Sequence, residues 1–236
     1  MEIKTFSGAE LARGCAEFVA KAAEDAVAQN GIFVLGISGG ETPKTVFEIL
    51  ASQDFAGKSF WGKTHVFWAD ERFVPQDDEE NNYHVARETL FDKLPVKPQL
   101  YPVNTGMKTS EAAAKTYGET ICSFERTHTG RKAFFDLILL GIGADGHTAS
   151  LFPNRALTAN TAPALAVTAP PGIKPEERIT LTVPMLSDSG TALFLVSGAK
   201  KRAAMREIAS GKPLPPLMIL PRGKAVIFCD REAFGG

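Results

Sequence analysis

One histidine lies where it could move a proton. His147 ends a glycine-rich segment, residues 141–147, that directly follows a strongly apolar run. Near neutral pH, an imidazole can take a proton from water and so activate that water for attack. His65, His84 and His128 lack such a setting. We therefore expect His147 to be a general base.

A cluster of three charged residues, Asp70, Glu71 and Arg72, follows a second apolar run that contains Trp68. A guanidinium can bind a phosphate through two parallel hydrogen bonds, so Arg72 is a candidate phosphate ligand. The alternative for Arg72 is an internal salt bridge with Asp70 or Glu71. The sequence leaves both interpretations open.

Further basic residues occur near the predicted ends of later elements. Arg178 precedes an apolar run, and Lys200, Lys201 and Arg202 follow Gly198 at the start of a predicted helix. A helix N-terminus attracts anions, and a lysine there adds to the attraction. Taken singly, each of these residues fits a solvated surface charge better than a ligand site.

The segment at residues 36–40 reads G-x-S-x-G, which is also the pattern around a serine nucleophile in some hydrolases. In that arrangement the helix begins directly after the serine. Here Thr42 begins the predicted helix, with Pro43 at its first position, about four residues after Ser38. The wider, glycine-lined loop favours a phosphate site built from backbone N–H groups, although a nucleophilic Ser38 and a plain connecting turn stay open.

A second motif, G-x-G-x-x-G at residues 141–146, matches the dinucleotide-binding fingerprint. That fingerprint requires a long helix directly after it, and Pro153 interrupts the chain too soon. The acidic residue expected after the following strand is also missing, because Val167 and Thr168 occupy that region. A nicotinamide cofactor is therefore not expected.

The elements that carry these motifs alternate between helices and strands. Helices are predicted at residues 7–30, from 42 onward, 82–91, 110–127 and 200–209. Strands are predicted at residues 32–37, 65–69, 100–103, 135–140, 164–168, 179–183, 191–196 and 225–229. This alternation predicts an α/β fold with a mostly parallel sheet. Ligands bind beyond the carboxyl ends of such strands, where loops at residues 38–40, 70–72 and 141–147 are expected.

Composition narrows the class of protein further. The 236 residues are 44% hydrophobic and 22% charged, with a net charge of −1, which does not suggest a nucleic-acid surface. Cys15, Cys122 and Cys229 form no C-x-x-C pair, and no His, Cys, Asp or Glu set has metal-ligand spacing. No signal peptide or membrane span is visible. We expect one α/β domain over residues 1–236, in the cytoplasm, without metal or cofactor. The sequence does not determine the oligomeric state and is compatible with a monomer.

Five stretches together resemble the 6-phosphogluconolactonase family. They are Ser38-Gly-Gly-Glu-Thr-Pro43, Trp68-Ala-Asp-Glu-Arg-Phe-Val-Pro75, residues 136–153, Glu177-Arg-Ile-Thr180 and Gly198-Ala-Lys-Lys201. The string Asp-Gly-His-Thr-Ala-Ser-Leu-Phe-Pro at residues 145–153 is the most specific. Departures from the family pattern are minor: Ala144 replaces a common proline, and Asn81 replaces a frequent serine.

The resemblance implies a doubly wound, Rossmann-like fold shared with glucosamine-6-phosphate deaminases and ribose-5-phosphate isomerases. It also implies hydrolysis of 6-phospho-glucono-1,5-lactone without a metal. By position, His147 would be the general base and Asp145 would orient it or set the polarity of the site. The remaining expected ligands of the phosphorylated substrate are Ser38, Gly39, Gly40, Asp70, Arg72, Arg178 and Lys201.

Two other functions remain as alternatives. Glucosamine-6-phosphate deaminases share Asp-Gly-His but continue with Asn-Glu-Pro, whereas Ser150 to Pro153 follow here, so the catalytic glutamate of those enzymes is absent. A sugar-phosphate sensor on the same fold would be expected to lose its base or to carry an added DNA-binding segment. This chain keeps His147 and has no spare domain.

Overall fold

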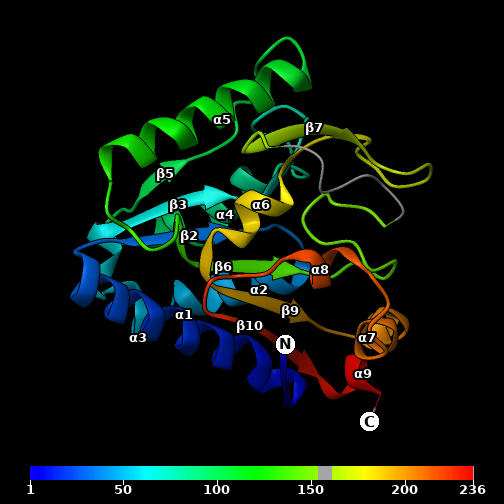
Figure 1. The fold of residues 1–236 in the computed structure, drawn as a ribbon. Coiled ribbons are helices and arrows are strands. Elements are labelled where there is room, and N and C mark those ends of the chain that lie inside the picture. Colours follow the sequence, from blue (N-terminus) through cyan, green and yellow to red (C-terminus); the bar gives the residue numbers. More distant parts are fainter. Residues whose placement is uncertain (154–160, 236) are drawn as a thin grey trace.

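The chain is described by a computed structural model, which covers residues 1–153 and 161–235. A seven-stranded sheet forms its centre, in the order β1-β10-β9-β6-β2-β3-β5, and every neighbouring pair is parallel (Figure 1). The strands are β1 (Glu2–Phe6), β2 (Phe33–Ile37), β3 (Thr64–Trp68), β5 (Gln99–Tyr101), β6 (Phe135–Gly141), β9 (Ser189–Val196) and β10 (Lys224–Asp230). The predicted α/β fold with a mostly parallel sheet is confirmed.

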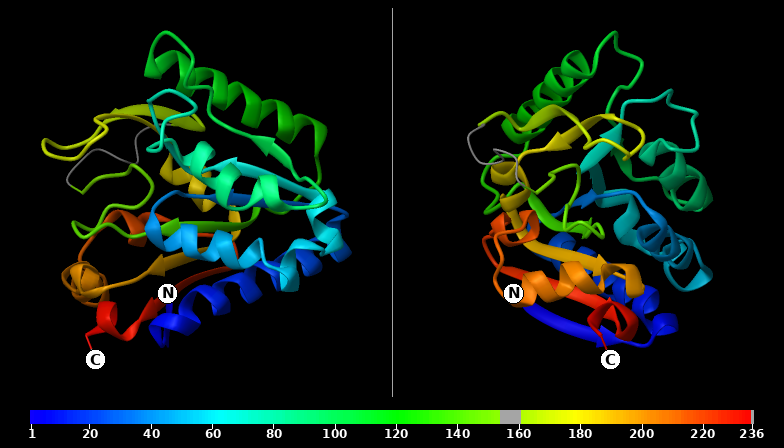
Figure 2. Two further views of the ribbon diagram at one scale, coloured as in Figure 1. Left: turned by 180° about the vertical axis from the view of Figure 1, so that it is seen from behind. Right: turned by 90° about the vertical axis from the view of Figure 1, so that its right-hand side faces the viewer.

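Helices cover both faces of this sheet (Figure 2). The longer ones are α1 (Gly8–Asn30), α2 (Glu41–Leu50), α4 (Asn82–Thr89), α5 (Ser110–Thr127) and α7 (Arg202–Ala209). Short helices are α3 (Gln53–Ala56), α6 (Val183–Ser187), α8 (Pro215–Met218) and α9 (Arg231–Phe234), and 3₁₀ turns are η1 (Ser59–Lys63), η2 (Phe91–Lys93) and η3 (Ala199–Lys201). None of the helices in the described part of the chain has both the length and the apolar character needed to cross a bilayer.

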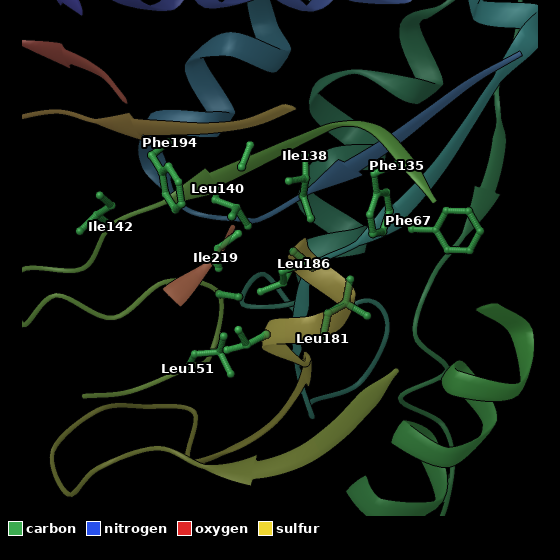
Figure 3. Packing of buried hydrophobic residues seen from close by; sticks show 14 of the residues in the cluster. Phe67, Phe135, Ile138, Leu140, Ile142, Leu151, Leu181, Leu186, Phe194 and Ile219 are labelled. Carbon is green, nitrogen blue, oxygen red and sulfur yellow. The ribbon is translucent and has the colours of Figure 1, made fainter. Parts of the chain in front are cut away.

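Two clusters of buried apolar residues fill the space between the sheet and its helices. One lies against α1, α2 and α4, and the other lies against α5, α6 and α7. Figure 3 shows Ile138 and Leu140 of β6 in the second cluster, facing Leu186 of α6. Because both faces of the strands are covered, the strands are continuous apolar runs, which is why they could be recognised from sequence.

A second, three-stranded antiparallel sheet has the order β4-β8-β7 and is formed by β4 (Asp70–Arg72), β7 (Ala164–Thr168) and β8 (Glu177–Leu181). The expectation that residues 70–72 form a loop is therefore wrong. Asp70 pairs with Thr180 and Arg72 with Arg178. A strand of three polar residues has no apolar pattern of its own, so only its distant partner strand reveals it.

Several boundaries also differ from the sequence prediction. Helix α2 begins at Glu41 rather than Thr42, so Pro43 is the third helical residue, which is tolerated because the first turn has no intrahelical N–H partners. Strand β8 ends at Leu181, and Val183 begins α6. Strand β1 was not predicted; it lies at the sheet edge, paired with β10.

Candidate active site

A cavity of about 350 Å³ lies at the carboxyl ends of β2, β6 and β9, next to β4 and β8. Eight of the nine predicted site residues line it: Ser38, Gly39, Gly40, Asp70, Arg72, His147, Arg178 and Lys201. The ninth, Asp145, is hydrogen-bonded to His147. The structure therefore brings all nine together, although they come from five separate stretches of the chain.

A short hydrogen bond orients the imidazole of His147. Its Nδ1 lies 2.5 Å from Oδ1 of Asp145, and its backbone N–H also donates to that oxygen at 3.2 Å. Burial opposes ionisation of Asp145, but the hydrogen bonds from His147 hold the pKa of the carboxyl below its ordinary value. An ionised Asp145 accepts the proton carried by Nδ1, so the other ring nitrogen, Nε2, is left as the proton acceptor.

Gly143 is needed for this arrangement. A Cβ atom at Gly143 would lie 2.2 Å from Nδ1 of His147 and 2.5 Å from Oδ1 of Asp145. The backbone N–H of Gly143 also donates to the carbonyl of His147 at 2.8 Å, which closes the loop. Any side chain at this position would displace the histidine–aspartate pair.

The segment after His147 is tied to the rest of the site by side-chain hydrogen bonds. Thr148 Oγ1 donates to the carbonyl of Gly141 at 2.7 Å, and Ser150 Oγ donates to Oδ2 of Asp70 at 2.8 Å. Ala149 between them has a φ of 47°, in the left-handed region that non-glycine residues seldom adopt. This strain is consistent with a loop whose shape is imposed by its surroundings.

Arg178 on β8 is a buried cation, with a relative exposure of 4%. Its Nε donates to the carbonyl of Pro175 at 2.9 Å, and one terminal nitrogen donates to the carbonyl of Lys174 at 3.1 Å. Burial lowers the pKa of Arg178, and the nearby charge of Arg72 lowers it further. Two like charges brought together in a partly buried place favour an anionic ligand between or beside them.

Among the described residues, the guanidinium of Arg72 is paired with neither Asp70 nor Glu71. One terminal nitrogen donates to the carbonyl of Glu80 at 2.7 Å and lies 3.5 Å from the carboxylate of Glu80. Its buried Nε has no acceptor within the described residues. The side chain therefore keeps donor capacity for a ligand in the cavity.

Lys201 lies at the end of η3, and of the three basic residues at positions 200–202 only Lys201 lines the cavity. Burial lowers the pKa of the Lys201 ammonium, while the charge of Asp145 raises it. The preceding turn is held by Asp230, whose Oδ2 accepts from the N–H of Gly198 at 2.9 Å. These contacts place a partly desolvated cation near the histidine–aspartate pair.

The glycine loop at residues 38–40 joins β2 to α2. Ser38 is 5% exposed, and its Oγ has no hydrogen-bond partner among the described residues. No hydrogen bond in the described part of the chain therefore links Ser38 to a base, as the nucleophile interpretation would require. Gly40 has a φ of 108° and precedes the first residue of α2, whose N-terminal N–H groups lie beside the cavity.

Two supporting residues were not found from the sequence. The Glu71 carboxylate, fully buried, accepts hydrogen bonds from the backbone N–H groups of Arg72, Asn82 and Tyr83 at 2.6–2.9 Å. Burial raises the pKa of Glu71 to about 8, against the opposing effect of these three donors. Asn82 lines the cavity and donates to the carbonyl of Asp70 at 2.9 Å. The only sequence signal was a pair of asparagines before a predicted helix.

Within residues 1–153 and 161–235, no group of three or more His, Cys, Asp or Glu side chains is arranged to hold a metal ion. The arrangement that is present combines an oriented imidazole with three cations and the N-terminus of α2. Such a site can transfer a proton while it holds a phosphorylated substrate.

Comparison with known proteins agrees with this description. Residues 7–228 match the family of glucosamine-6-phosphate isomerases/6-phosphogluconolactonase, and the chain belongs to that family. It is 36% identical over 214 residues to a protein named 6-phosphogluconolactonase from Synechocystis, covering 88% of this chain and 86% of the relative. It is also 34% identical over 212 residues to a probable 6-phosphogluconolactonase from Schizosaccharomyces pombe, covering 86% and 81%.

Solved structures show the same fold. The crystal structure of 6-phosphogluconolactonase from Thermotoga maritima superposes with a TM-score of 0.84 at 29% identity, covering 97% of this chain and 99% of that one. A structure from Shewanella baltica superposes with a TM-score of 0.81 at 25% identity, covering 98% and 97%. The doubly wound fold expected from the family resemblance is confirmed.

Proposed function

We propose that this chain hydrolyses 6-phospho-D-glucono-1,5-lactone to 6-phospho-D-gluconate, as a step of the oxidative pentose phosphate pathway. The family and the named relatives support the reaction. One structural observation carries the mechanism: His147, held by Asp145, lines a single cavity with Arg72, Arg178 and Lys201. The substrate offers a carbonyl carbon for attack at one end and a phosphate at the other.

In this mechanism His147 acts on water. Its Nε2 takes a proton from a water molecule as the oxygen bonds to the lactone carbonyl carbon. The bond from the carbonyl carbon to the ring oxygen of the tetrahedral intermediate then breaks. The ring oxygen takes a proton from the imidazolium and becomes a hydroxyl group of the open chain. A lactone is an activated ester, so no covalent nucleophile is required, and base catalysis of this kind contributes about 10²–10⁴-fold. Asp145 keeps the imidazole in the required tautomer.

The cations hold the other end of the substrate. Arg72, Arg178 and Lys201 would bind the phosphate, with donors from Ser38 and the glycine loop. Fixing the phosphate in this way places the carbonyl carbon at a defined distance from the base. Asp70 stabilises the charge of Arg178 and is available to sugar hydroxyls through oxygen not used by Ser150.

The test is lactone hydrolysis, with 6-phosphogluconolactone generated in situ and the spontaneous rate subtracted. Wild type, His147→Ala and wild type with a chelator are measured side by side. Fast, chelator-resistant turnover that the variant loses is the expected result. No acceleration over the spontaneous rate would overturn the proposal. Ammonia release from glucosamine-6-phosphate would then test the deaminase alternative, and ligand binding without turnover would test the sensor.

We further propose a cytoplasmic, monomeric enzyme with a single domain over residues 1–236. Three free thiols, Cys15, Cys122 and Cys229, fit a reducing compartment. Cell fractionation tests the location, and light scattering tests whether the mass in solution is that of one 25.4 kDa chain. One cooperative unfolding transition would support the single domain, and two separate transitions would contradict it.

A further inference from the structure

The ring of Phe152 contacts two parts of the candidate site at once. Its centroid lies 5.0 Å from that of the His147 imidazole, with the two planes inclined by 47°. The guanidinium carbon of Arg178 lies 5.9 Å from the same centroid. One side chain therefore lies against both the proposed base and a proposed phosphate ligand.

Packing of the hydrophobic cores does not account for this position. Phe152 is 1% exposed, yet among residues 1–153 and 161–235 it belongs to neither cluster of buried apolar residues that packs the sheet against its helices. The preceding residue, Leu151, does belong to one of them. Within the described residues, the aromatic and cation–π contacts of the Phe152 ring are those to His147 and Arg178.

Both partners are held elsewhere by hydrogen bonds. His147 is held at Nδ1 by Asp145, and Arg178 is held by the carbonyls of Lys174 and Pro175. The ring of Phe152 lies against each of these held side chains, so it adds a packing contact to the hydrogen bonds that orient them. The negative face of an aromatic ring also attracts a guanidinium.

We propose that Phe152 is a positioning residue that sets the separation between His147 and Arg178. The inference rests on the proposed lactone hydrolysis, in which His147 acts at the carbonyl carbon and Arg178 binds the phosphate. With both ends of the substrate held, a displacement of about 1 Å can cost about 10²-fold in rate. Because Phe152 adjusts both ends, its loss should lower kcat and raise KM together.

The test compares two substitutions that remove a buried ring. Phe152→Leu removes the proposed positioning contact. Phe33→Leu removes a ring that is equally buried, at the first residue of β2, on the opposite edge of the sheet from the cavity. Phe152→Tyr keeps the ring, and Phe152→Met is a second ring-free variant in case Phe152→Leu does not fold. Thermal unfolding and lactone hydrolysis are measured for each.

We expect Phe152→Leu to have a kcat/KM at least about tenfold below that of Phe33→Leu, through changes in both constants, and Phe152→Tyr to restore most of it. Equal kcat/KM in Phe152→Leu and Phe33→Leu would overturn the positioning role while the wild type stays active. An inactive wild type would instead overturn the proposed function itself, so the two failures are distinguishable.

Discussion

A cavity lies at each end of the strands of the central sheet, one at the amino edge and one at the carboxyl edge. The larger of these two cavities is not the candidate site. At the amino ends of β6, β9 and β10, a cavity of about 630 Å³ lies beside α1, whereas the candidate site has about 350 Å³. At the larger cavity, Lys21 and Asp25 form an exposed pair on α1. Arg131 pairs with Asp136 at 2.7 Å, and Asp136 also accepts from the N–H of Val34.

The two cavities differ in what their polar side chains do. At the amino edge, Asp136 holds two strand ends and a loop together, which is a structural task. At the carboxyl edge, Ser38, Asp70 and Arg178 are each at most 5% exposed and still line an open cavity. Burying polar groups beside a cavity is costly unless a ligand or a fixed network compensates. Oriented, desolvated groups therefore favour the carboxyl edge as the candidate site, although its cavity is the smaller of the two.

The largest expected effect is a loss of kcat on removal of a side chain at the carboxyl edge. His147→Ala should lower kcat by about 10²-fold or more, because it removes the base while the fold remains. Lactone hydrolysis with spontaneous turnover subtracted measures this. The matched control is His84→Ala, which removes a histidine that lies 3.5 Å from Glu88 on α4, and it should keep wild-type kcat. Wild-type activity in His147→Ala would remove this residue from the mechanism.

A second substitution tests the phosphate end. Arg72→Ala should raise KM about tenfold or more with a smaller change in kcat, since a charge-assisted contact to the substrate is lost. Arg87→Ala is the control, because Arg87 is a partly exposed arginine that is paired with Asp92 and does not line the cavity. An unchanged KM would mean that Arg72 serves only its contact with Glu80.

The glycine loop supplies a steric test. In Gly39→Ala the new Cβ would lie 1.9 Å from Oδ1 of Asn82, so Asn82 must move and its bond to Asp70 is lost. We expect a destabilisation of about 1–3 kcal/mol and a severalfold rise in KM. Gly57→Ala, where nothing lies within 4 Å of the new atom, should change neither. Urea unfolding and steady-state kinetics give the two readouts, and a wild-type KM in Gly39→Ala would contradict the close approach.

The smallest expected effect is a change in the pH dependence of stability, and it comes from His65 at the amino edge. Burial, followed by the charges of His128 and Arg131, lowers the pKa of His65 to about 4. Between about pH 6.5 and 4 the unfolded chain binds this proton and the folded chain does not, so the free energy of unfolding falls as the pH falls. His65→Phe should remove part of this fall, of the order of 1 kcal/mol for a half-buried ring screened by solvent.

The control for this prediction is activity. Because His65 lies far from the carboxyl edge, at the second residue of β3, His65→Phe should keep wild-type kcat at neutral pH. Urea unfolding at pH 4.5 and pH 7 measures the stability difference. An identical loss of stability on acidification in the wild type and the variant would show that His65 does not titrate in this range.

Much of the fold could be predicted because its strongest signals are local. Helix α5 has the predicted bounds, and α1 begins after Ser7, which bonds to Glu10, and ends before Gly31, whose φ is 78°. Strand β1 was missed because an edge strand of five residues, mostly exposed, has no continuous apolar run. Strand β4 was missed because its three polar residues become a strand only through pairing with β8.

The nine candidate residues could be named because they lie in stretches that resemble one family. Composition alone singled out the glycine-rich loops around Ser38 and His147, whereas Asp70, Arg178 and Lys201 were named through the resemblance. The contact between Asp145 and His147 could be expected because the two residues are only two positions apart in the sequence. Their exact roles stay predictions until the variants above are measured. What could not be foreseen was Glu80 as the partner of Arg72, or the buried Glu71 that accepts three backbone N–H groups.

By itself, the sequence determined the alternation of strands and helices, the strand ends that carry the polar motifs, and the family. Those features depend on residues near one another in the chain, through apolar periodicity and turn chemistry. The tertiary structure alone decided which cations line the cavity with the histidine and that the ring of Phe152 contacts Arg178 as well as His147. The contacts with Arg72, Arg178 and Lys201 join segments that the chain separates widely, and such contacts form only when the sheet and its helices pack.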